Sequence, residues 1–317
     1  MIPYLLIVAG FVALTFGADF LVDGASSVAK RMKISDLLIG LTVVAFGTSA
    51  PELVVNLVAA INGNNEIALT NVLGSNIINV FIILGVSASI YPIFCQKSLR
   101  RFEIPLAASA GLLVLLLSMN FFVPAWGEKG LSRIDGLLLL AVFVFFMYQT
   151  IKTGLKAGND DAEEVKLKPL GLSLLMILGG LILLVLGGNW IVNSATAIAK
   201  SWGVSDALIG VTVVALGTSL PELATSVMAV LKKNGDMAIG NVIGSNIFNV
   251  FFVLATSATI RPLSDYPNLL IDAAMAFLGC FLVWIFVVRG KHRIERWQGF
   301  FLLAVYALYL FWIIKNL

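Results

Sequence analysis

Charged residues are scarce in this chain. They make up 12% of its 317 residues, against 59% hydrophobic residues, whereas a soluble domain averages about 25% charged residues. Side chains of this composition cannot cover a surface that faces water, which excludes a soluble globular protein.

Histidine and cysteine are scarcer still, and the sequence contains only His292, Cys95 and Cys280. No transition-metal cluster can be built from them, and we expect the thiols to be unpaired. No basic run with interleaved aromatic residues indicates a nucleic-acid partner.

Apolar runs fill most of the sequence. A bilayer core about 30 Å thick is crossed by roughly 20 apolar residues, and turn and charge signals divide the chain into ten such runs. The first run has no basic segment before it and resembles a later one, so we interpret it as a retained helix rather than a signal peptide. The sequence predicts an all-α integral membrane protein with ten transmembrane helices, near residues 2–22, 36–60, 66–90, 104–123, 134–152, 170–192, 206–231, 237–260, 268–288 and 297–315.

The two halves of the chain repeat one another. A shift of 170 residues, without a gap, places residues 17–81 on residues 187–251, and 15 of the 22 positions in 35–56 are identical in the second copy. We therefore predict a first five-helix repeat over 1–152, a charged linker over 153–169 and a second five-helix repeat over 170–317. Five spans per repeat force the second copy to enter the membrane upside down, which is typical of secondary transporters.

The basic residues predict the orientation in the membrane. The loops after spans 1, 3, 5, 7 and 9 contain 16 of the 21 Lys and Arg residues. Cytoplasmic loops carry the excess of basic residues in membrane proteins. We therefore expect a multi-pass protein of the cell (inner) membrane, with a cytoplasmic linker and both termini outside.

Two acidic residues lie deep inside predicted spans. Glu52 is about one turn from the middle of span 36–60, and Glu222 has the matching position in span 206–231. Such a residue costs roughly 2.5–3.5 kcal/mol at the centre of a membrane helix and usually lines an ion or substrate path. Two at matching positions indicate a cation site between the repeats.

The neighbouring residues supply further oxygen atoms. Pro51 has no N–H to give the Gly47 carbonyl, so we predict a broken helix with free carbonyls at Ala45, Phe46 and Gly47. Hydroxyl and amide groups one turn or one span away complete an all-oxygen set, which suits hard cations such as Ca²⁺ and Na⁺. The candidate side chains are Thr48, Ser49, Ser75 and Asn79, with Thr218, Ser219, Ser245 and Asn249 in the second copy.

Plainer interpretations exist for several of these residues. Ser49 and Glu52 also fit a capping box at a helix start. Small residues such as Gly74 and Ser75 also allow close helix packing. Asp36, which follows a serine at a helix start, is better interpreted as a cap than as a ligand.

The paired motifs Gly47-Thr-Ser-Ala-Pro-Glu52 and Gly217-Thr-Ser-Leu-Pro-Glu222, each followed by Gly-Ser-Asn, resemble the α-repeats of the Ca²⁺/cation antiporter superfamily. The Thr-Ser-x-Pro-Glu core is similar to its Na⁺/Ca²⁺ exchanger branch, prokaryotic type. The resemblance implies four cation positions that hold either Na⁺ or one Ca²⁺, no cofactor besides these transported ions, and function as a monomer. It implies Ca²⁺ ligands at Glu52, Glu222 and the carbonyls of Thr48 and Thr218, with Na⁺ ligands at Ala45, Ala215, Ser49, Ser219, Ser75 and Ser245. Asn79 and Asn249 match the remaining polar positions, where some members carry one Asp.

These expectations describe an electrogenic Na⁺/Ca²⁺ antiporter in which spans 1 and 6 slide past a core that holds the site. A cation/proton antiporter on the same scaffold is the alternative, because buried glutamates also bind protons. A channel is disfavoured by the inverted repeats. A hydrolase with Ser49 as nucleophile lacks a base, because the single histidine lies in a loop. We therefore expect no enzyme.

Overall fold

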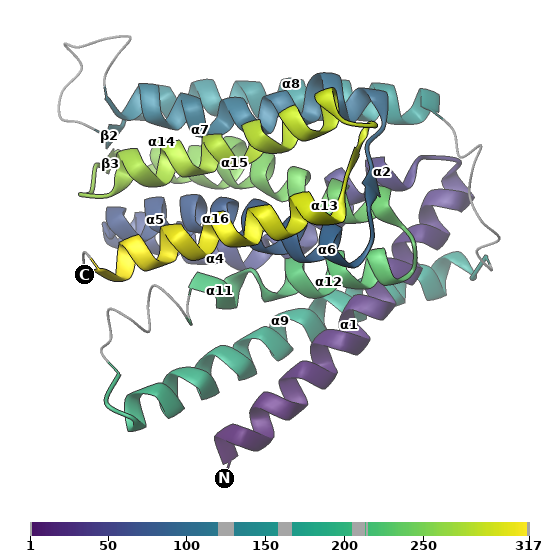
Figure 1. Ribbon diagram of the computed structural model, residues 1–317, viewed down its shortest axis with the longest axis horizontal. Helices are drawn as coiled ribbons and strands as arrows, with labels where there is room; N and C mark the ends of the chain where they lie inside the picture. The colour runs from purple at the N-terminus through teal and green to yellow at the C-terminus, as the bar shows by residue number, and fades with distance from the viewer. Residues whose placement is uncertain (1, 120–129, 158–166, 205–212, 214, 316–317) are drawn as a thin grey trace.

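The computed structural model describes residues 2–119, 130–157, 167–204, 213 and 215–315, and these residues are almost entirely helical (Figure 1). Composition explains this, because a backbone in lipid must satisfy its own hydrogen bonds. The elements of the first half are α1 (Ile2–Met32), α2 (Asp36–Ile39), η1 (Gly40–Val44), α3 (Ala45–Thr48), α4 (Ala50–Asn62), α5 (Asn65–Ile78), η2 (Asn79–Leu84), α6 (Gly85–Ile90), β1 (Ile93–Phe94), η3 (Leu99–Glu103), α7 (Ile104–Ser118), β2 (Gly130–Leu131) and α8 (Arg133–Ala157).

The second half follows the same plan. Its elements are α9 (Leu170–Ser201), α11 (Ala215–Thr218), α12 (Leu220–Leu231), α13 (Gly235–Phe248), η5 (Asn249–Leu254), α14 (Ala255–Ile260), β3 (Leu263–Ser264), α15 (Leu269–Arg289), β4 (Arg293–Ile294) and α16 (Arg296–Lys315). Segments labelled η are π-helical turns, which are rare and occur frequently at functional sites. Two of them, η2 and η5, begin at matching positions in the two copies, at Asn79 and at Asn249.

Among the described residues, eight helices are long and apolar enough to cross a membrane, and a bent pair, Asp36–Thr48 with Ala50–Asn62, raises the number to nine if it forms one span. The protein is an integral membrane protein. Of the predicted span 206–231, the structure describes Val213 and α11 onward, and residues 205–212 and 214 lie outside the described part. Two predicted spans were too short: the helices predicted to end at 22 and 192 continue to Met32 and Ser201.

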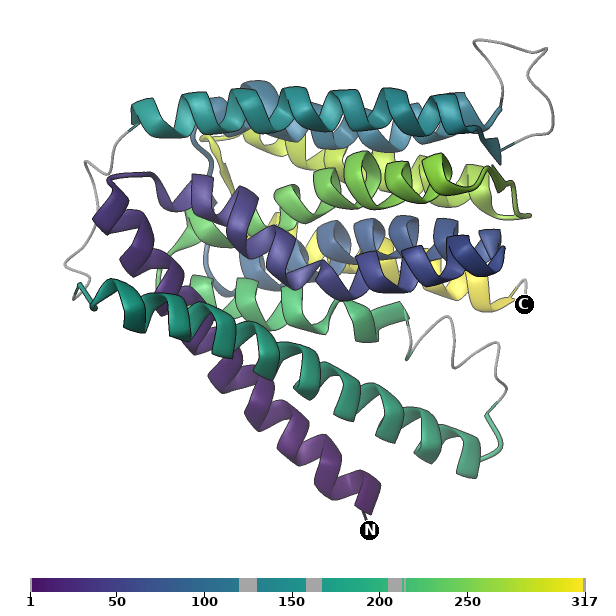
Figure 2. The same cartoon turned by 180° about the vertical axis from the view of Figure 1, so that it is seen from behind.

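Most helices run side by side in one block, and α1 and α9 cross each other at its edge (Figures 1 and 2). Helices α5 and α13 lie inside the block. Every residue of α13 from Met237 to Phe248 is buried, and none of these residues is charged. A helix that is apolar or uncharged on all sides is expected to be buried. We call α1 with α9 the crossing pair and the remaining helices the core.

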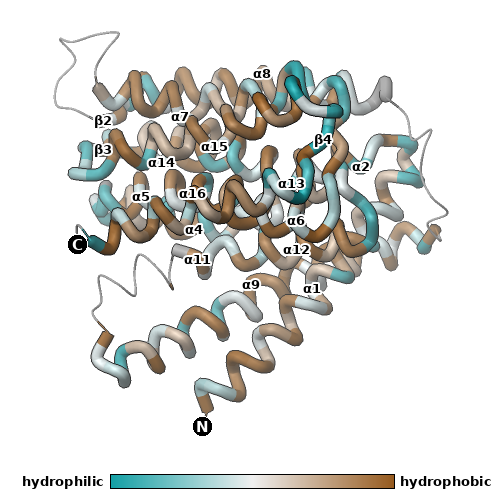
Figure 3. Tube along the Cα trace, in the orientation of Figure 1, coloured by the Kyte–Doolittle hydropathy of each residue, from teal (hydrophilic) through white to brown (hydrophobic). Residues whose placement is uncertain are grey.

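The loops gather at two ends of the block. At one end β1 pairs with β4, Asn234 bonds Asp36, and Gln96 bonds Asp236. At the other end β2 pairs with β3. Polar residues concentrate at both ends, and the helices between them are mostly hydrophobic (Figure 3). We call the first the basic end, because it collects the loops after spans 1, 3, 7 and 9, and the second the opposite end.

Candidate cation site

A break in the helix precedes each buried glutamate. Ser49 separates α3 from α4 with φ −85° and ψ 7°, and the helix axis bends by 48° there. Ser219 repeats this conformation between α11 and α12, with φ −89° and ψ 4°. A proline lies in the first turn after each break, where its missing N–H costs nothing. The predicted break is therefore present in both copies.

Glu52 and Glu222 lie in the first turns of α4 and α12, and neither is exposed. The N-terminal end of a helix carries partial positive charge, which stabilises a carboxylate in that turn. The breaks therefore bring two short helices with their positive ends and one acid each into the interior of the core.

Hydrogen bonds between the two halves reach both carboxylates, and we call the residues that these bonds gather around Glu52 and Glu222 the network. The Ser49 hydroxyl donates to Glu222 Oε1 at 2.8 Å. The Ser75 hydroxyl lies 3.3 Å from Glu52 Oε1 and 3.1 Å from the Ser219 hydroxyl. The Thr218 side chain also hydrogen-bonds Glu52. Ser49 makes no cap bond to its own helix, so the capping-box interpretation is wrong for this serine.

Several buried oxygen atoms in this network lack a hydrogen-bond partner among the described residues. They are Glu52 Oε2, Glu222 Oε2, Asn79 Oδ1, Asn249 Oδ1 and Ser245 Oγ. A buried polar atom without a partner costs about 1–3 kcal/mol, and more when it is charged. All five belong to residues that the sequence singles out, and each can donate a lone pair to a cation.

The chemistry of the network is that of a site for a hard cation. Every atom it offers is an oxygen of a carboxylate, hydroxyl or amide, the donors that Na⁺ and Ca²⁺ prefer. The described residues contain no group of three or more His, Cys, Asp and Glu side chains that suits a metal. The network therefore offers two carboxylates among neutral oxygens.

The other predicted residues lie in or beside the network. Thr48 is buried, and its hydroxyl lies 3.1 Å from both the Val44 carbonyl and Asn241 Oδ1. The Asn79 amide donates to Asn246 Oδ1 at 3.0 Å, and the Asn249 amide donates to Ser75 Oγ at 3.2 Å. Ala215 begins α11, next to residues outside the described part.

One detail of the prediction is wrong. The Ala45 carbonyl is not freed by the break, because it accepts the amide of Ser49 at 3.1 Å. The chain turns at Ser49 itself, two residues after Gly47. Only the second lone pair of the Ala45 oxygen is available to an ion. Asp36 is likewise not the cap of its helix, since the Ser35 side chain accepts the Leu38 amide.

Sequence reasoning missed a set of asparagines that support the site. Asn71 donates to Asn56 Oδ1 at 2.6 Å and to the Glu52 carbonyl at 3.4 Å. Asn241 does the same in the second copy, with Ser226 Oγ at 2.9 Å and the Glu222 carbonyl at 3.3 Å. Their recurrence at a spacing of 170 residues was a signal for this role.

A groove lies apart from these carboxylates. It has a volume of about 690 Å³, lies between α3, α8, α9 and α13, and is lined by apolar side chains such as Phe46, Phe143 and Leu181. None of the candidate side-chain ligands lines it.

Known proteins resemble the chain along its whole length. A family model described as sodium/calcium exchanger protein matches residues 2–152 and 172–315. The chain is 37% identical over 319 residues to the putative antiporter CaxA of Alkalimonas amylolytica, with 98% of each chain covered. It is 30% identical to the sodium/calcium exchanger MaX1 of Methanosarcina acetivorans, with 98% of this chain and 97% of that protein covered. A solved structure of the sodium-calcium exchanger NCX_Mj, soaked with Na⁺ and Ca²⁺, matches with a TM-score of 0.83 and 31% identity over 97% of each chain.

Proposed function

The chain belongs to the sodium/calcium exchanger family, whose members are membrane cation antiporters, and from this we propose that it exchanges Na⁺ for Ca²⁺ by alternating access. The observation that carries the proposal is the pair of buried glutamates, one from each half, each hydrogen-bonded to a hydroxyl group of the other half and each keeping one oxygen without a partner among the described residues. A divalent cation neutralises the pair, and so do Na⁺ ions. The same site then serves both substrates in turn.

The proposed ligands divide by the charge they supply. Glu52 and Glu222 neutralise the ion, and neutral oxygens complete six to eight bonds around Ca²⁺. The neutral set contains the carbonyls and hydroxyls of Thr48, Thr218, Ser49, Ser219, Ser75 and Ser245, the carbonyls of Ala45 and Ala215, and the amides of Asn79 and Asn249.

The proposed architecture is ten transmembrane helices in two inverted five-helix repeats, 1–152 and 170–317, around a linker over 153–169. The matching breaks at Ser49 and Ser219 support it. We propose that the linker is cytoplasmic, that both termini are outside the cell membrane, and that a monomer completes the transport cycle. No nucleic acid and no enzymatic reaction enters the proposal.

Coupling follows from electrostatics. Two carboxylates in a low-dielectric interior repel each other strongly when no cation lies between them. Moving that empty state past the crossing pair is costly, whereas the state loaded with Na⁺ or Ca²⁺ is compensated. The protein therefore exchanges one cation for another and does not let either leak down its gradient. The cycle is electrogenic when the total charge of the transported Na⁺ ions exceeds that of Ca²⁺.

Radiocalcium uptake into proteoliposomes loaded with Na⁺ tests the proposal. Glu52→Gln removes one of two site charges, so we expect uptake to fall to the level of protein-free vesicles while the protein still folds. Glu103→Gln is the matched control, because Glu103 is also a buried glutamate, 3% exposed, but lies outside the network. Normal uptake by Glu52→Gln would contradict the proposal.

The same vesicles separate Na⁺ coupling from proton coupling. We expect Ca²⁺ uptake to require an outward Na⁺ gradient and to be absent when only a pH gradient is imposed. Uptake driven by the pH gradient alone would instead identify a cation/proton antiporter.

A further inference from the structure

We propose that Lys232 is a positioning residue that latches α1 to the core at the basic end. Its ion pairs with Asp19 and Asp23 favour the state described here, in which α1 covers the core at the basic end. The inference rests on the proposed alternating access. It gives three residues outside the ion site a role in setting the side of the membrane to which the site opens.

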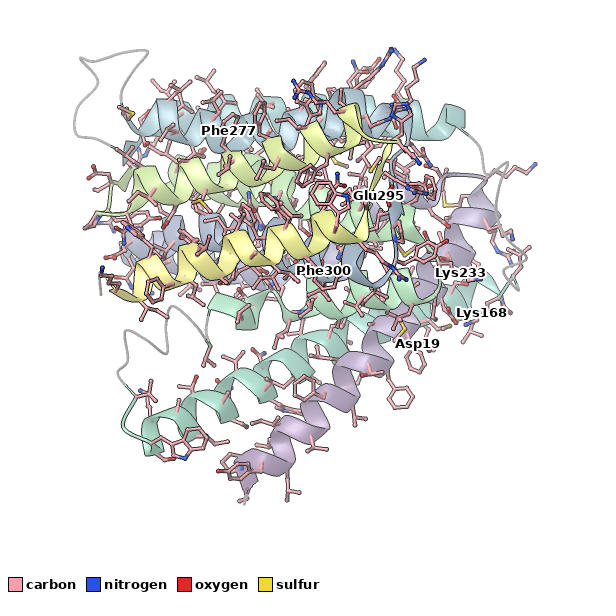
Figure 4. The ribbon with its side chains drawn as sticks, viewed as in Figure 1. Asp19, Lys168, Lys233, Phe277, Glu295 and Phe300 are labelled. Atoms are coloured by element: carbon pink, nitrogen blue, oxygen red, sulfur yellow. The ribbon has the colours of Figure 1, made fainter. Side chains whose placement is uncertain are left out.

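Lys232 follows α12, at the point where the core meets α1. Its Nζ lies 2.6 Å from Asp19 Oδ1 and 3.3 Å from the Asp19 carbonyl oxygen, and it also forms an ion pair with Asp23 Oδ1. The second oxygen of Asp23 accepts from Lys168 Nζ at 2.8 Å. Asp19 and Lys168 gather with Lys233, the neighbour of Lys232, at one corner of the molecule (Figure 4).

Lys168 and Lys232 join different parts of the structure. Lys168 immediately precedes α9, and Asp23 lies on α1, so their ion pair holds the crossing pair together. Lys232 belongs to the core, so its ion pairs join the crossing pair to the core. Only a contact of the second kind changes when the crossing pair slides as a unit.

The geometry shows which state the latch holds. At the basic end α1 is buried, with an almost unbroken buried run from Gly24 to Ala29. At the opposite end no residue of Ile2–Ala9 is buried. The N-terminal end of α1 and the C-terminal end of α9 there extend away from the block (Figures 1 and 2). The latch therefore holds the pair where it covers the core at the basic end.

The other copy has no such latch. The shift of 170 residues places Asp19 on Asn189, Asp23 on Asn193 and Lys232 on Asn62, so all three charged residues become asparagines. The Thr-Ser-x-Pro-Glu segments, in contrast, are the same in both copies. In the other state of the transport cycle, in which the crossing pair covers the core at the opposite end, the corresponding contact would join neutral amides. These attract each other less than a lysine attracts two carboxylates. The two states of a symmetric scaffold are thus made unequal by charges at one end.

The expected effect of the latch on the ratio of the two states is modest. The side chains of Lys232, Asp19 and Asp23 are 27%, 40% and 35% exposed, and water and salt weaken ion pairs of this kind. We expect their loss to change the ratio of the two states by about 3- to 10-fold. A shift of this size changes the apparent affinity at each face, because it scales with the population of the state open there.

Spin labels on Val8→Cys and Leu308→Cys measure the two states directly. Both side chains are exposed, at 63% and 71%, on α1 and α16, and the native cysteines are buried. Pulsed dipolar spectroscopy in lipid nanodiscs gives the populations without any transport. We expect Lys232→Asn to decrease the population of the state described here by about 3- to 10-fold relative to the other, and Lys232→Arg to retain it.

Two control variants isolate the latch. Lys233→Asn removes the same charge from a neighbouring residue that makes no ion pair in the described chain, and its positive φ of 58° suits asparagine. Lys168→Asn breaks the ion pair inside the crossing pair. We expect neither to shift the populations. The triple change Asn62→Lys, Asn189→Asp and Asn193→Asp builds the latch at the other end and should shift them the other way.

The outcomes separate this inference from the proposed function. Unchanged populations in Lys232→Asn, or equal shifts in Lys233→Asn, would overturn the latch even if Ca²⁺ exchange is normal. A shift in Lys232→Asn that Lys232→Arg does not show supports the latch even if radiocalcium uptake fails. If Lys232→Asn does not fold, the triple variant in the native background decides by the direction of its shift.

Discussion

Buried polar side chains have two roles in this interior. Some of the proposed ligands, such as Glu52, Glu222 and Asn79, keep an oxygen without a partner, and we propose that these oxygens take up an ion. Asn76 and Asn246 instead satisfy one another, because each side chain donates to the backbone carbonyl of the other, at 3.1 and 3.3 Å. This second pair joins the halves.

Asn246→Ala tests the joining role. The substitution leaves the Asn76 carbonyl and the Asn79 amide without their buried partner, which should lower the free energy of unfolding by about 1–3 kcal/mol. Thermal unfolding in detergent measures it. Asn64→Ala is the matched control, since Asn64 is exposed and makes no cap bond. An equal loss in both variants would contradict the role.

At the scale of elements, α1 and α9 touch backbone to backbone. A Cβ added at Gly17 would lie 2.9 Å from the Gly180 carbonyl oxygen, and one added at Gly180 would lie 2.7 Å from the Gly17 oxygen. Gly10 and Gly187 repeat this one heptad away. Small residues let membrane helices approach closely where no hydrophobic force drives them together. This close contact supports our proposal that the crossing pair moves as one unit.

Two adjacent glycines of α9 give a matched test of this contact. Gly180→Ala places a methyl group against the Gly17 carbonyl, whereas nothing lies within 4 Å of a Cβ at Gly179. We expect Gly180→Ala to lower stability by about 1–3 kcal/mol through overpacking. Gly179→Ala should be neutral or stabilising by up to about 1 kcal/mol. Thermal unfolding in nanodiscs compares them, and the opposite ranking would refute the close contact.

At the scale of the whole molecule, the two ends differ in charge. The loops at the basic end, after spans 1, 3, 7 and 9, carry 12 of the 21 Lys and Arg residues, and those joined by β2 and β3 carry few. Because basic loops stay in the cytoplasm, the basic end should face inward. In the state described here, the crossing pair would then cover the core at the cytoplasmic end.

A maleimide that cannot cross membranes tests this orientation in intact cells. Lys97 and Asp265 are exposed at the basic and the opposite end, so we expect Asp265→Cys to be labelled and Lys97→Cys to react only after lysis. The native background should be low. Burial, helped by the Asp236 carboxylate, raises the pKa of the Cys95 thiol, which keeps it protonated and unreactive at neutral pH. The reverse labelling pattern would invert the proposed topology.

The sequence alone determined the membrane class, the repeat, the broken helices and the two acids. Each of these depends on local composition or on matching two stretches of chain. Helix ends were harder to predict. Asp19 and Asp23 resemble a boundary in the sequence, but α1 continues to Met32, because Lys168 and Lys232 neutralise them.

Only the tertiary structure decided which atoms meet. The bond from Ser49 to Glu222 joins residues 173 positions apart, and no periodicity predicts which serine reaches which acid. The π-helical turns at Asn79 and Asn249 and the contact of Lys232 with α1 are equally invisible in sequence. The physical reason is that hydrogen bonds and ion pairs depend on ångström-scale distances, which the packing of all the helices together sets.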